Sequence, residues 1–423
     1  MFNLLQKSSL KFHVVKALIK MRIITFFLSI QFILTITGCF KSEQPDNFAP
    51  KLVWKAPLLN GVESFTFNPV FYKDMVIYGV KYARSGSSEK PSVVALKKAT
   101  GEKVWEWKNA LKDYDFFSTA AEYYIYQNIF VFSTGPRVYA IDLETGKSLW
   151  NTQAPESGDI NIVGLGSKIY YVQLNFDKTK STLCTADIAL GNWKPVFIAQ
   201  KQNMVSSIGG RMEIHKDSDG ENYLYFTHSH TDLQYIASEV HLDKLNVRTD
   251  SMVLNKTLAN SNVYRISAID NKGVYLTGGE ATCFDKNTGE VVKKYDLPGL
   301  QNHNYGSGRC IINGNKMFAP TDFPKLICYN IDSGNILWSE DGLSTSLPSR
   351  LIYHDGIIYY TSSSDGFLHA IDENGKRYWK FQSPDRKGSG NGIFDAVISI
   401  DAAENRLYVS SYYNAICYET IKK

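Results

Sequence analysis

The sequence predicts an all-β fold, an eight-bladed β-propeller made of four-stranded antiparallel blades. Three observations predict it: one hairpin motif recurs, a short apolar run precedes each copy, and the copies follow one another at a nearly constant spacing. Helical periodicity is almost absent after the first 40 residues. Together these features indicate a repeat architecture built from strands.

The hairpin motif is clearest in VYAIDLETGKSLW, residues 138–150. Its first half alternates with the two-residue period of a pleated strand. Glu144-Thr145-Gly146 has the composition of a tight turn, because Gly146 can adopt a positive φ. A second strand then begins and ends in Trp150. The motif therefore predicts the two outer strands of a blade.

The spacing of the copies gives the repeat length. The turn glycines are Gly101, Gly146, Gly289, Gly334 and Gly375, and Gly191 marks a weaker copy. Neighbouring glycines lie 45 residues apart in three cases and 41 residues apart in a fourth. The gap of 98 residues between Gly191 and Gly289 leaves room for one more copy. We expect it at about 205–255, degenerate and without the Gly and the Trp.

Counting the upstream runs gives eight blades, the last of which lacks its outermost strand when the chain stops. Residues 51–57, KLVWKAP, resemble the Trp-containing end of the other repeats. We predict that they complete the last blade and so close the ring, which removes an open edge. Trp54 then stands where Trp105, Trp150, Trp338 and Trp379 stand elsewhere. The alternative is a seven-bladed ring with a loose N-terminal strand.

The repeated residues are expected to join neighbouring blades. Each Trp would bury apolar surface between two blades and needs a partner for its N–H, and each turn glycine would let another backbone approach closely. A small residue recurs before the turn, at Ala95, Ala140, Cys283, Cys328, Ala370 and Cys417. Cys184 and Cys310 also fall in strand-like runs. We therefore predict buried free thiols and no metal site among the cysteines.

The first fifty residues predict secretion and anchoring. Residues 1–38 are interpreted as a signal peptide, with Met21 as the true start, because an apolar stretch follows Arg22. The residues just before Cys39 resemble the lipobox of bacterial lipoproteins, in which the cysteine becomes the lipidated N-terminus. Residues 39–50 would form a polar tether and residues 51–423 the propeller. The alternative is an ordinary membrane helix.

The charge balance argues against a nucleic-acid partner. The whole chain has 46 basic and 42 acidic residues, a net charge of +4. Residues 1–38 contain five basic residues and no acidic one, so 41 basic and 42 acidic residues remain after the signal, a net charge of −1. A protein without a broad positive field lacks the electrostatic footprint of nucleic-acid binding.

The pattern in AIDLETGKSLW, residues 140–150, resembles the PQQ-type propeller repeat. That repeat occurs in quinoprotein alcohol dehydrogenases and in the propeller lipoproteins of the outer-membrane β-barrel assembly machine. The resemblance implies a non-catalytic, monomeric scaffold, lipid-anchored in the bacterial envelope at the outer membrane. Its partners would be outer-membrane assembly proteins or other envelope proteins, bound partly through strand edges.

Two other functions stay open. One is a PQQ-dependent or sugar-oxidising oxidoreductase, although the sequence has no adjacent cysteine pair and no Glu–Asn–Asp set at matching positions. The other is a surface lipoprotein that binds carbohydrate or peptides. No cofactor is expected, and PQQ is implied by the resemblance alone. If a small ligand binds, we expect it at the axial funnel, near His303, Tyr305, Arg309, Arg350 and Asn391.

Two smaller motifs favour structural interpretations. His228 and His230 lie two residues apart on a strand, so their side chains point to the same face. They could contribute to a metal site with His215 or His241, but we predict that they are exposed strand histidines and bind no metal. The segment KDSDGEN, residues 216–222, does not match a calcium loop and is expected to be a polar hairpin turn. Tyr412 and Tyr413 are expected to be exposed.

Overall fold

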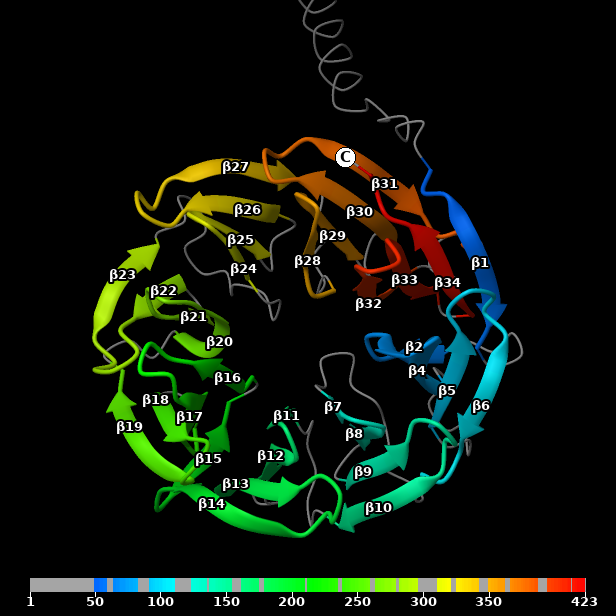
Figure 1. The fold of residues 1–423 in the computed structure, drawn as a ribbon. Coiled ribbons are helices and arrows are strands. Elements are labelled where there is room, and N and C mark those ends of the chain that lie inside the picture. Colours follow the sequence, from blue (N-terminus) through cyan, green and yellow to red (C-terminus); the bar gives the residue numbers. More distant parts are fainter. Residues whose placement is uncertain are drawn as a thin grey trace, which may run out of the picture. The chain divides into compact units, whose positions relative to one another are not determined.

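A computed structural model describes residues 49–58, 64–82, 91–110, 123–134, 137–153, 161–174, 179–209, 211–234, 238–258, 263–278, 281–295, 310–320, 325–341, 349–361, 366–386, 394–411 and 413–422. The chain separates into two compact units, Met1–Asn47 and Phe48–Lys423. The predictions made for the leader, for Met21 and for Cys39 lie outside the described residues. In the second unit the described strands form a ring of eight sheets (Figure 1).

The first four blades follow the chain. Blade 1 contains β2 (Ser64–Thr66), β3 (Val70–Tyr72), β4 (Met75–Tyr82), β5 (Ser92–Lys97) and β6 (Lys103–Trp107). Blade 2 contains β7 (Tyr124–Tyr126), β8 (Ile129–Thr134), β9 (Arg137–Asp142) and β10 (Ser148–Gln153). Blade 3 contains β11 (Ile162–Leu165), β12 (Lys168–Leu174), β13 (Lys180–Asp187) and β14 (Trp193–Gln200). Blade 4 contains β15 (Met204–Ile208), β16 (Glu213–Lys216), β17 (Asn222–Asp232), β18 (Ser238–Asn246) and β19 (Ser251–Thr257).

The remaining blades complete the ring. Blade 5 contains β20 (Val263–Ile269), β21 (Val274–Gly278), β22 (Ala281–Phe284) and β23 (Val291–Tyr295). Blade 6 contains β24 (Ile311–Asn313), β25 (Lys316–Pro320), β26 (Lys325–Asn330) and β27 (Ile336–Asp341). Blade 7 contains β28 (Ile352–His354), β29 (Ile357–Thr361), β30 (Phe367–Asp372) and β31 (Arg377–Gln382). Blade 8 contains β32 (Phe394–Asp401), β33 (Arg406–Ser411), β34 (Asn414–Glu419) and β1 (Leu52–Pro57).

The predicted eight-bladed fold and its closure by the N-terminal strand are confirmed. Strand β1 pairs antiparallel with β34, and Trp54 lies opposite Cys417. The same register places Trp105 opposite Ala95 in blade 1, next to the same kind of strand irregularity. Blade 8 is therefore assembled from both ends of the propeller, and the seven-bladed alternative does not hold.

Blades 1 and 4 differ from the others in their innermost layer. In blade 4 the 11-residue strand β17 pairs with β15 along one half and with β16 along the other. A short inner strand cannot cover a partner of that length, because each residue advances only about 3.3 Å. In blade 1, β2 and β3 divide β4 in the same way. Polar turn chemistry is confirmed for residues 217–221, where Asp217 N donates to Glu221 O between β16 and β17.

The outer tryptophans pack on the turn glycines of the following blade. A Cβ added to Gly146 would lie 2.7 Å from the Trp105 ring, so only glycine leaves room for the indole. Trp105 Nε1 also donates to Leu143 O at 3.0 Å, just before that glycine. Trp54 makes the same pair of contacts with Gly101 and with Lys98 O, across the closure. We expected a backbone beside these glycines, but the neighbour is a side chain.

The contact repeats around the ring with substitutions. Trp150 packs on Gly191, and Trp338 packs on Gly375. Lysine side chains occupy the place of the indole elsewhere: Lys256 lies against Gly289, and Lys293 lies against Gly334. The Lys293 ammonium donates to Asp332 O, which is the type of bond that an indole N–H makes in other blades. Trp379 is buried against Tyr359 and faces the blade that both chain ends complete.

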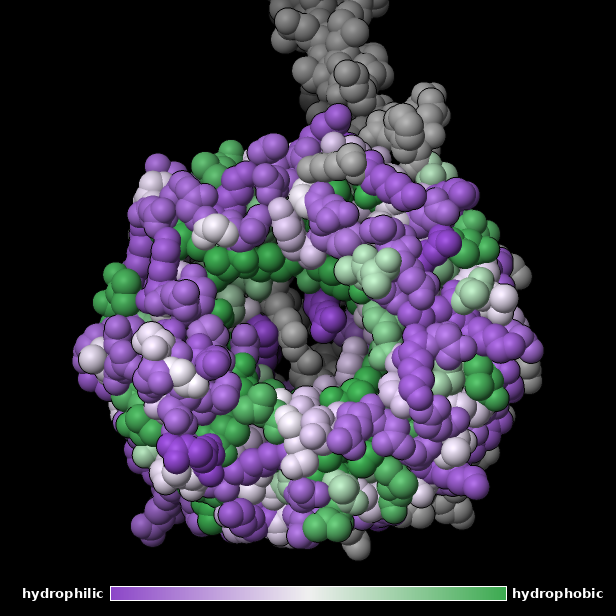
Figure 2. All heavy atoms as spheres, viewed as in Figure 1, coloured by the Kyte–Doolittle hydropathy of each residue, from purple (hydrophilic) through white to green (hydrophobic). Residues whose placement is uncertain are grey.

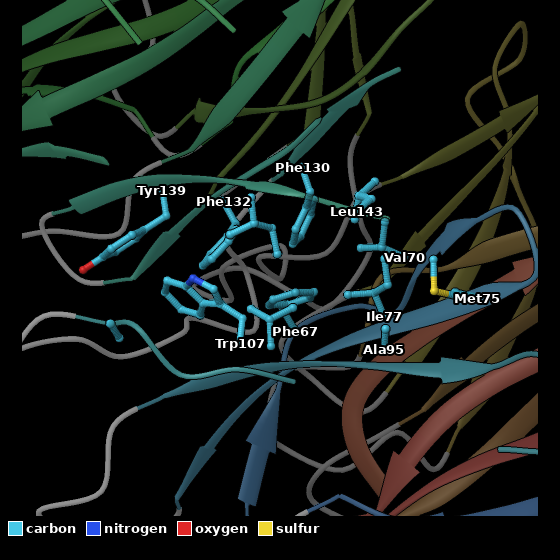
Figure 3. Close-up of a cluster of buried hydrophobic side chains, with 13 residues drawn as sticks. Phe67, Val70, Met75, Ile77, Ala95, Trp107, Phe130, Phe132, Tyr139 and Leu143 are labelled. Carbon is cyan, nitrogen blue, oxygen red and sulfur yellow. The ribbon is translucent and has the colours of Figure 1, made fainter. Parts of the chain in front are cut away.

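The core lies between neighbouring blades. Figure 3 shows this for blades 1 and 2, where Trp107 lies beside Phe132 and Tyr139. The Trp107 indole N–H donates to Ser148 Oγ at 2.7 Å, so the polar atom of this buried ring is satisfied. The ring of blades thus contains one apolar layer at each interface.

The prediction of buried free thiols is confirmed for the described residues. Five cysteines there are free and buried: Cys184, Cys283, Cys310, Cys328 and Cys417. Burial raises the pKa of the Cys417 thiol to about 12, which keeps it protonated and unreactive. In the described part of the chain, no helix is long and apolar enough to cross a bilayer.

We predict that Gly146→Ala destabilises the ring more than Gly166→Ala. Both glycines have a positive φ, +67° and +59°, but a Cβ at Gly166 meets nothing within 4 Å. The strained backbone alone costs about 1–2 kcal/mol, and the clash with Trp105 adds about 1–3 kcal/mol. Thermal unfolding followed by circular dichroism gives the comparison. Equal melting temperatures for the two variants would contradict the packing account.

A second prediction concerns the carboxylate that ties the closing strand. Asp385 accepts hydrogen bonds from Ser411 and Asn414, and Lys55 Nζ of β1 lies 2.9 Å away. Burial alone would raise the pKa of Asp385, but these three donors outweigh it, and the net pKa is lowered. The ionised carboxylate therefore adds stability above its unfolded pKa, and this stability is lost as pH falls through the lower folded value.

Asp385→Asn should accordingly lower the free energy of unfolding by about 1–3 kcal/mol near neutral pH. The difference from the wild type should shrink as pH falls below about 4. Glu290→Gln, which breaks an exposed pair with Lys256, is the matched control and should have little effect at any pH. Urea unfolding at several pH values measures this. If the difference in free energy of unfolding between the wild type and Asp385→Asn stays constant with pH, ionisation of Asp385 does not contribute to stability.

Candidate functional site

The axial residues can be placed only in part. His303, Tyr305, Arg309 and Asn391 lie outside the described residues. Arg350 is half-buried and lies just before β28, the innermost strand of blade 7.

The charge of Arg350 acts on Tyr123, just before β7, and on Arg211, just before β16. These three residues each precede an innermost strand of a different blade. Figure 2 shows that the ring is hollowed at its middle. Arg211 is also paired with Glu213, and it donates to Ser267 O at 2.6 Å. Burial lowers the pKa of Arg211.

Blade 4 departs most from the repeat, as the degenerate copy predicted. Asp250 takes the turn position that glycine holds elsewhere, with φ of 56° and its N–H donating to Asn246 O. Lys244 takes the small-residue position, opposite Leu254, where blades 1, 2, 6, 7 and 8 have tryptophan. This blade therefore lacks the indole, the glycine and the small residue together.

A charged network replaces the apolar contact at that point. The buried Lys244 ammonium lies 2.7 Å from Asp217 and 4.1 Å from the centre of the Tyr223 ring. Asp217 also accepts from Tyr225 OH at 2.7 Å and lies 3.2 Å from Lys286. Burial by itself would raise the pKa of Asp217, but these donors and cations lower it overall. The arrangement neutralises a buried lysine, so we interpret it as structural.

Three histidines form a second cluster on blade 4, at its interface with blade 3. His228 and His230 point to one face of β17, and His241 of β18 lies directly opposite His228. The His228 and His241 rings stack with centroids 4.2 Å apart, and the His228 ring contacts Phe197 of β14. One ligand nitrogen from each histidine lies within 4.8 Å of those of the other two.

Acidic and hydroxyl side chains surround this cluster. His228 Nδ1 is 2.5 Å from Asp243, His230 Nδ1 is 2.9 Å from Ser206, and His241 Nε2 is 2.7 Å from Glu239.

Burial, followed by the neighbouring histidines, lowers the pKa of His230 to about 4, so this imidazole is neutral at neutral pH. Hydrogen bonds from Lys201 and His241 lower the pKa of Glu239 to about 2. Burial raises the pKa of Asp243. The cluster thus combines a neutral imidazole with an ionised carboxylate.

The prediction of exposed strand histidines is wrong. His228, His230 and His241 are only 3%, 7% and 8% exposed, because their face of the sheet packs on blade 3 rather than facing solvent. The spacing of His228 and His230 correctly indicated that both side chains point to one face of a strand. The sequence could not show that His241 lies opposite His228 on the neighbouring strand. His215 is not part of the group; it lies on β16 near Lys286 and Asp217.

The outermost strands of the blades form a second candidate surface, which we call the outer rim: β1, β6, β10, β14, β19, β23, β27 and β31. Each ends its sheet, so among the described residues one of its edges has no neighbouring strand. Apolar side chains are exposed along it: Leu52, Val104, Leu149, Trp193, Ile198, Val253, Val291, Val292, Ile336 and Leu337. In Figure 2 apolar residues interrupt the polar surface around the ring. Tyr413 is half-buried, and Tyr412 lies outside the described residues.

Comparisons with solved structures identify the same fold in proteins of different function. BamB from Moraxella catarrhalis superposes with a TM-score of 0.55 at 14% identity, covering 88% of this chain and 100% of that one. A quinohemoprotein alcohol dehydrogenase from Pseudomonas putida gives 0.58 at 11% identity, covering 88% and 76%. A computationally designed protein, Ika8, gives 0.61 at 13% identity, covering 87% and 99%. At these identities the likeness shows the fold alone.

Sequence comparison is more specific. The outer membrane protein assembly factor BamB of Escherichia coli K12 is 23% identical over 144 residues, which are 32% of this chain and 34% of that protein. The match thus spans about a third of that relative's length. The family model described as outer membrane protein assembly factor BamB matches residues 46–231 and 277–416, well over half of the chain. The chain therefore belongs to the family of BamB-like propellers with PQQ-type repeats.

Proposed function

We propose that the protein is a non-catalytic scaffold of the bacterial outer membrane that docks envelope proteins involved in barrel assembly. The observation that carries the proposal is the family match, which includes six of the eight blades in whole or in large part. Blade 4 is matched only through β17, and blade 5 only from the end of β21. A scaffold needs accessible binding surface and no reactive constellation.

The outer rim supports docking through strand edges. An edge strand presents unpaired N–H and C=O groups, to which an extended partner segment can add as a further strand. Strand β14 offers eight residues, and Trp193 and Ile198 on it are 45% and 46% exposed. Aromatic and aliphatic side chains at such an edge give a partner apolar contacts beside the backbone hydrogen bonds.

Anchoring belongs to the same proposal. The apolar stretch before Cys39 and the lipobox-like residues that precede it suit cleavage and lipidation at that cysteine. A single-point anchor followed by a polar tether would hold the ring near the membrane and leave its rim free to bind.

The oxidoreductase alternative has less support. Quinoprotein dehydrogenases commonly carry a disulfide between adjacent cysteines against the cofactor, and this sequence contains no adjacent cysteine pair. Near the axis the Glu213 carboxylate already faces Arg211, so that pair is a poor ligand set for calcium. The described residues therefore do not fit that cofactor, and we derive no step through it.

The proposal predicts site-specific crosslinks from the outer rim. A photo-crosslinking amino acid at Trp193 or Val253 should capture outer-membrane assembly proteins in intact cells, because both positions are exposed on edge strands. The same amino acid at Asp219, exposed in the turn before β17, is the control and should capture much less. Mass spectrometry of the crosslinked bands identifies the partners.

Cys39→Ala tests the anchor in the same experiment, because this variant should lose acyl labelling and most of its rim crosslinks. Equal capture from all three positions would contradict docking by the rim. Binding of PQQ with Ca²⁺ by the purified chain, measured by fluorescence quenching, together with absent rim crosslinks would favour the enzyme.

A further inference from the structure

We propose that His228, His230 and His241 of blade 4, with Glu239, form a binding site for a Zn²⁺-type divalent cation that clamps this blade. The histidines lie on β17 and β18, inside the outer rim, and the rim strands β14 and β19 pack against them. Family membership does not account for it, because Glu239 and His241 lie in residues 232–276, which the family model does not match. The inference rests on the donor set, on its outer hydrogen bonds and on its position in the fold.

The donor set has the composition of a zinc site. Imidazole nitrogens and carboxylate oxygens bind Zn²⁺ at about 2.0–2.2 Å, usually four at a time. The three histidines supply nitrogens within 4.8 Å of one another. In a tetrahedral four-coordinate site, two donors at about 2.1 Å from one ion lie about 3.4 Å apart. Binding would therefore draw the imidazole nitrogens closer together than the 4.8 Å within which they now lie.

The outer hydrogen bonds orient the imidazoles for this role. Each Nδ1 has a partner on a different strand: Asp243 of β18, Ser206 of β15, and Thr257 of β19 at 3.4 Å from His241. Asp243 is itself held by Asn255, which donates to its second oxygen at 2.8 Å. Metal-ligating histidines typically donate one ring N–H to a carboxylate or oxygen in this way and keep Nε2 for the ion.

The fourth ligand is available at the same place. Glu239 lies opposite His230 across β17 and β18, and its carboxylate is 2.7 Å from His241 Nε2. An ion would replace this hydrogen bond with two coordinate bonds, with the His241 proton shifting to Nδ1, beside Thr257. The Glu239 side chain is 35% exposed and pairs with Lys201, so the cluster reaches solvent at this end.

The position of the site in the fold indicates that a bound ion would stabilise the interface between blades 3 and 4. Blade 4 lacks the tryptophan and the glycine that join other blades, and its histidines lie against Phe197 of blade 3. An ion joining β17 to β18 would stiffen the strands that form this interface. Imidazole-rich donor sets favour Zn²⁺, Cu²⁺ and Ni²⁺ over Mg²⁺ and Ca²⁺. We use Zn²⁺ as the probe.

The test is calorimetric titration of the purified, chelator-treated full chain with Zn²⁺. We expect one ion per chain and a higher melting temperature with Zn²⁺ than with chelator. Asp243→Asn removes a hydrogen-bond partner of a ligand and should weaken Zn²⁺ binding by about 10–100-fold. His230→Ala and His241→Ala each remove a ligand itself and should weaken Zn²⁺ binding by more than that. The Co²⁺-loaded protein should show the absorption of a four-coordinate site.

His354→Ala is the matched control, because His354 is a half-buried strand histidine of blade 7 that bonds to Asn405. It should bind Zn²⁺ as the wild type does. Circular dichroism establishes that each variant is folded. The proposal is overturned if the wild type binds no more tightly than the His230→Ala/His241→Ala double variant, or if Zn²⁺ leaves the wild-type melting temperature unchanged. The readout is metal binding by the purified chain, so failure of this test can be told apart from failure of docking by the outer rim.

Discussion

The packing of one blade's outer tryptophan on the next blade's turn glycine is the contact on which the ring depends. It joins a strand that ends one sheet to a hairpin that ends the next, and the indole N–H bonds a backbone carbonyl there. The contact made by Trp54 is the most consequential, because it connects the N-terminal strand to blade 1. Since Trp54 lies on the strand that completes blade 8, one side chain links both ends of the propeller.

Blade 4 shows how the ring tolerates the loss of that contact. Where five of the other blades have a small residue opposite an indole, it has a buried lysine neutralised by Asp217. On its face toward blade 3, it has histidines held by Asp243, Ser206 and Glu239. Buried polar networks of this kind lower the stability of the fold unless every polar group in them has a hydrogen-bond or ion-pair partner. Both networks lie in blade 4, the blade that departs most from the repeat, and this is a reason to look there for a property of its own.

The same architecture explains why the outer rim is suited to binding. Closing the ring protects the inner strands and the interfaces between blades, but every blade still ends in an edge strand. Exposed apolar side chains on these edges, such as Trp193 and Val253, are compatible with solubility when polar residues separate them. A propeller therefore offers a partner several similar edges without exposing its core.

The sequence by itself determined the fold, the number of blades and the strand that closes the ring. Gly, Trp and their spacing repeat with the period of a blade, and repeats of one local motif need no knowledge of distant contacts. The sequence also located the degenerate blade and the alternating pair His228 and His230. Only the tertiary structure decided that His241 lies opposite His228, that this face is buried, and that a side chain, an indole or a lysine, packs on the turn glycines where a backbone was expected. The physical reason is that register and packing between blades join residues whose proximity depends on the whole ring, and no local pattern contains that information.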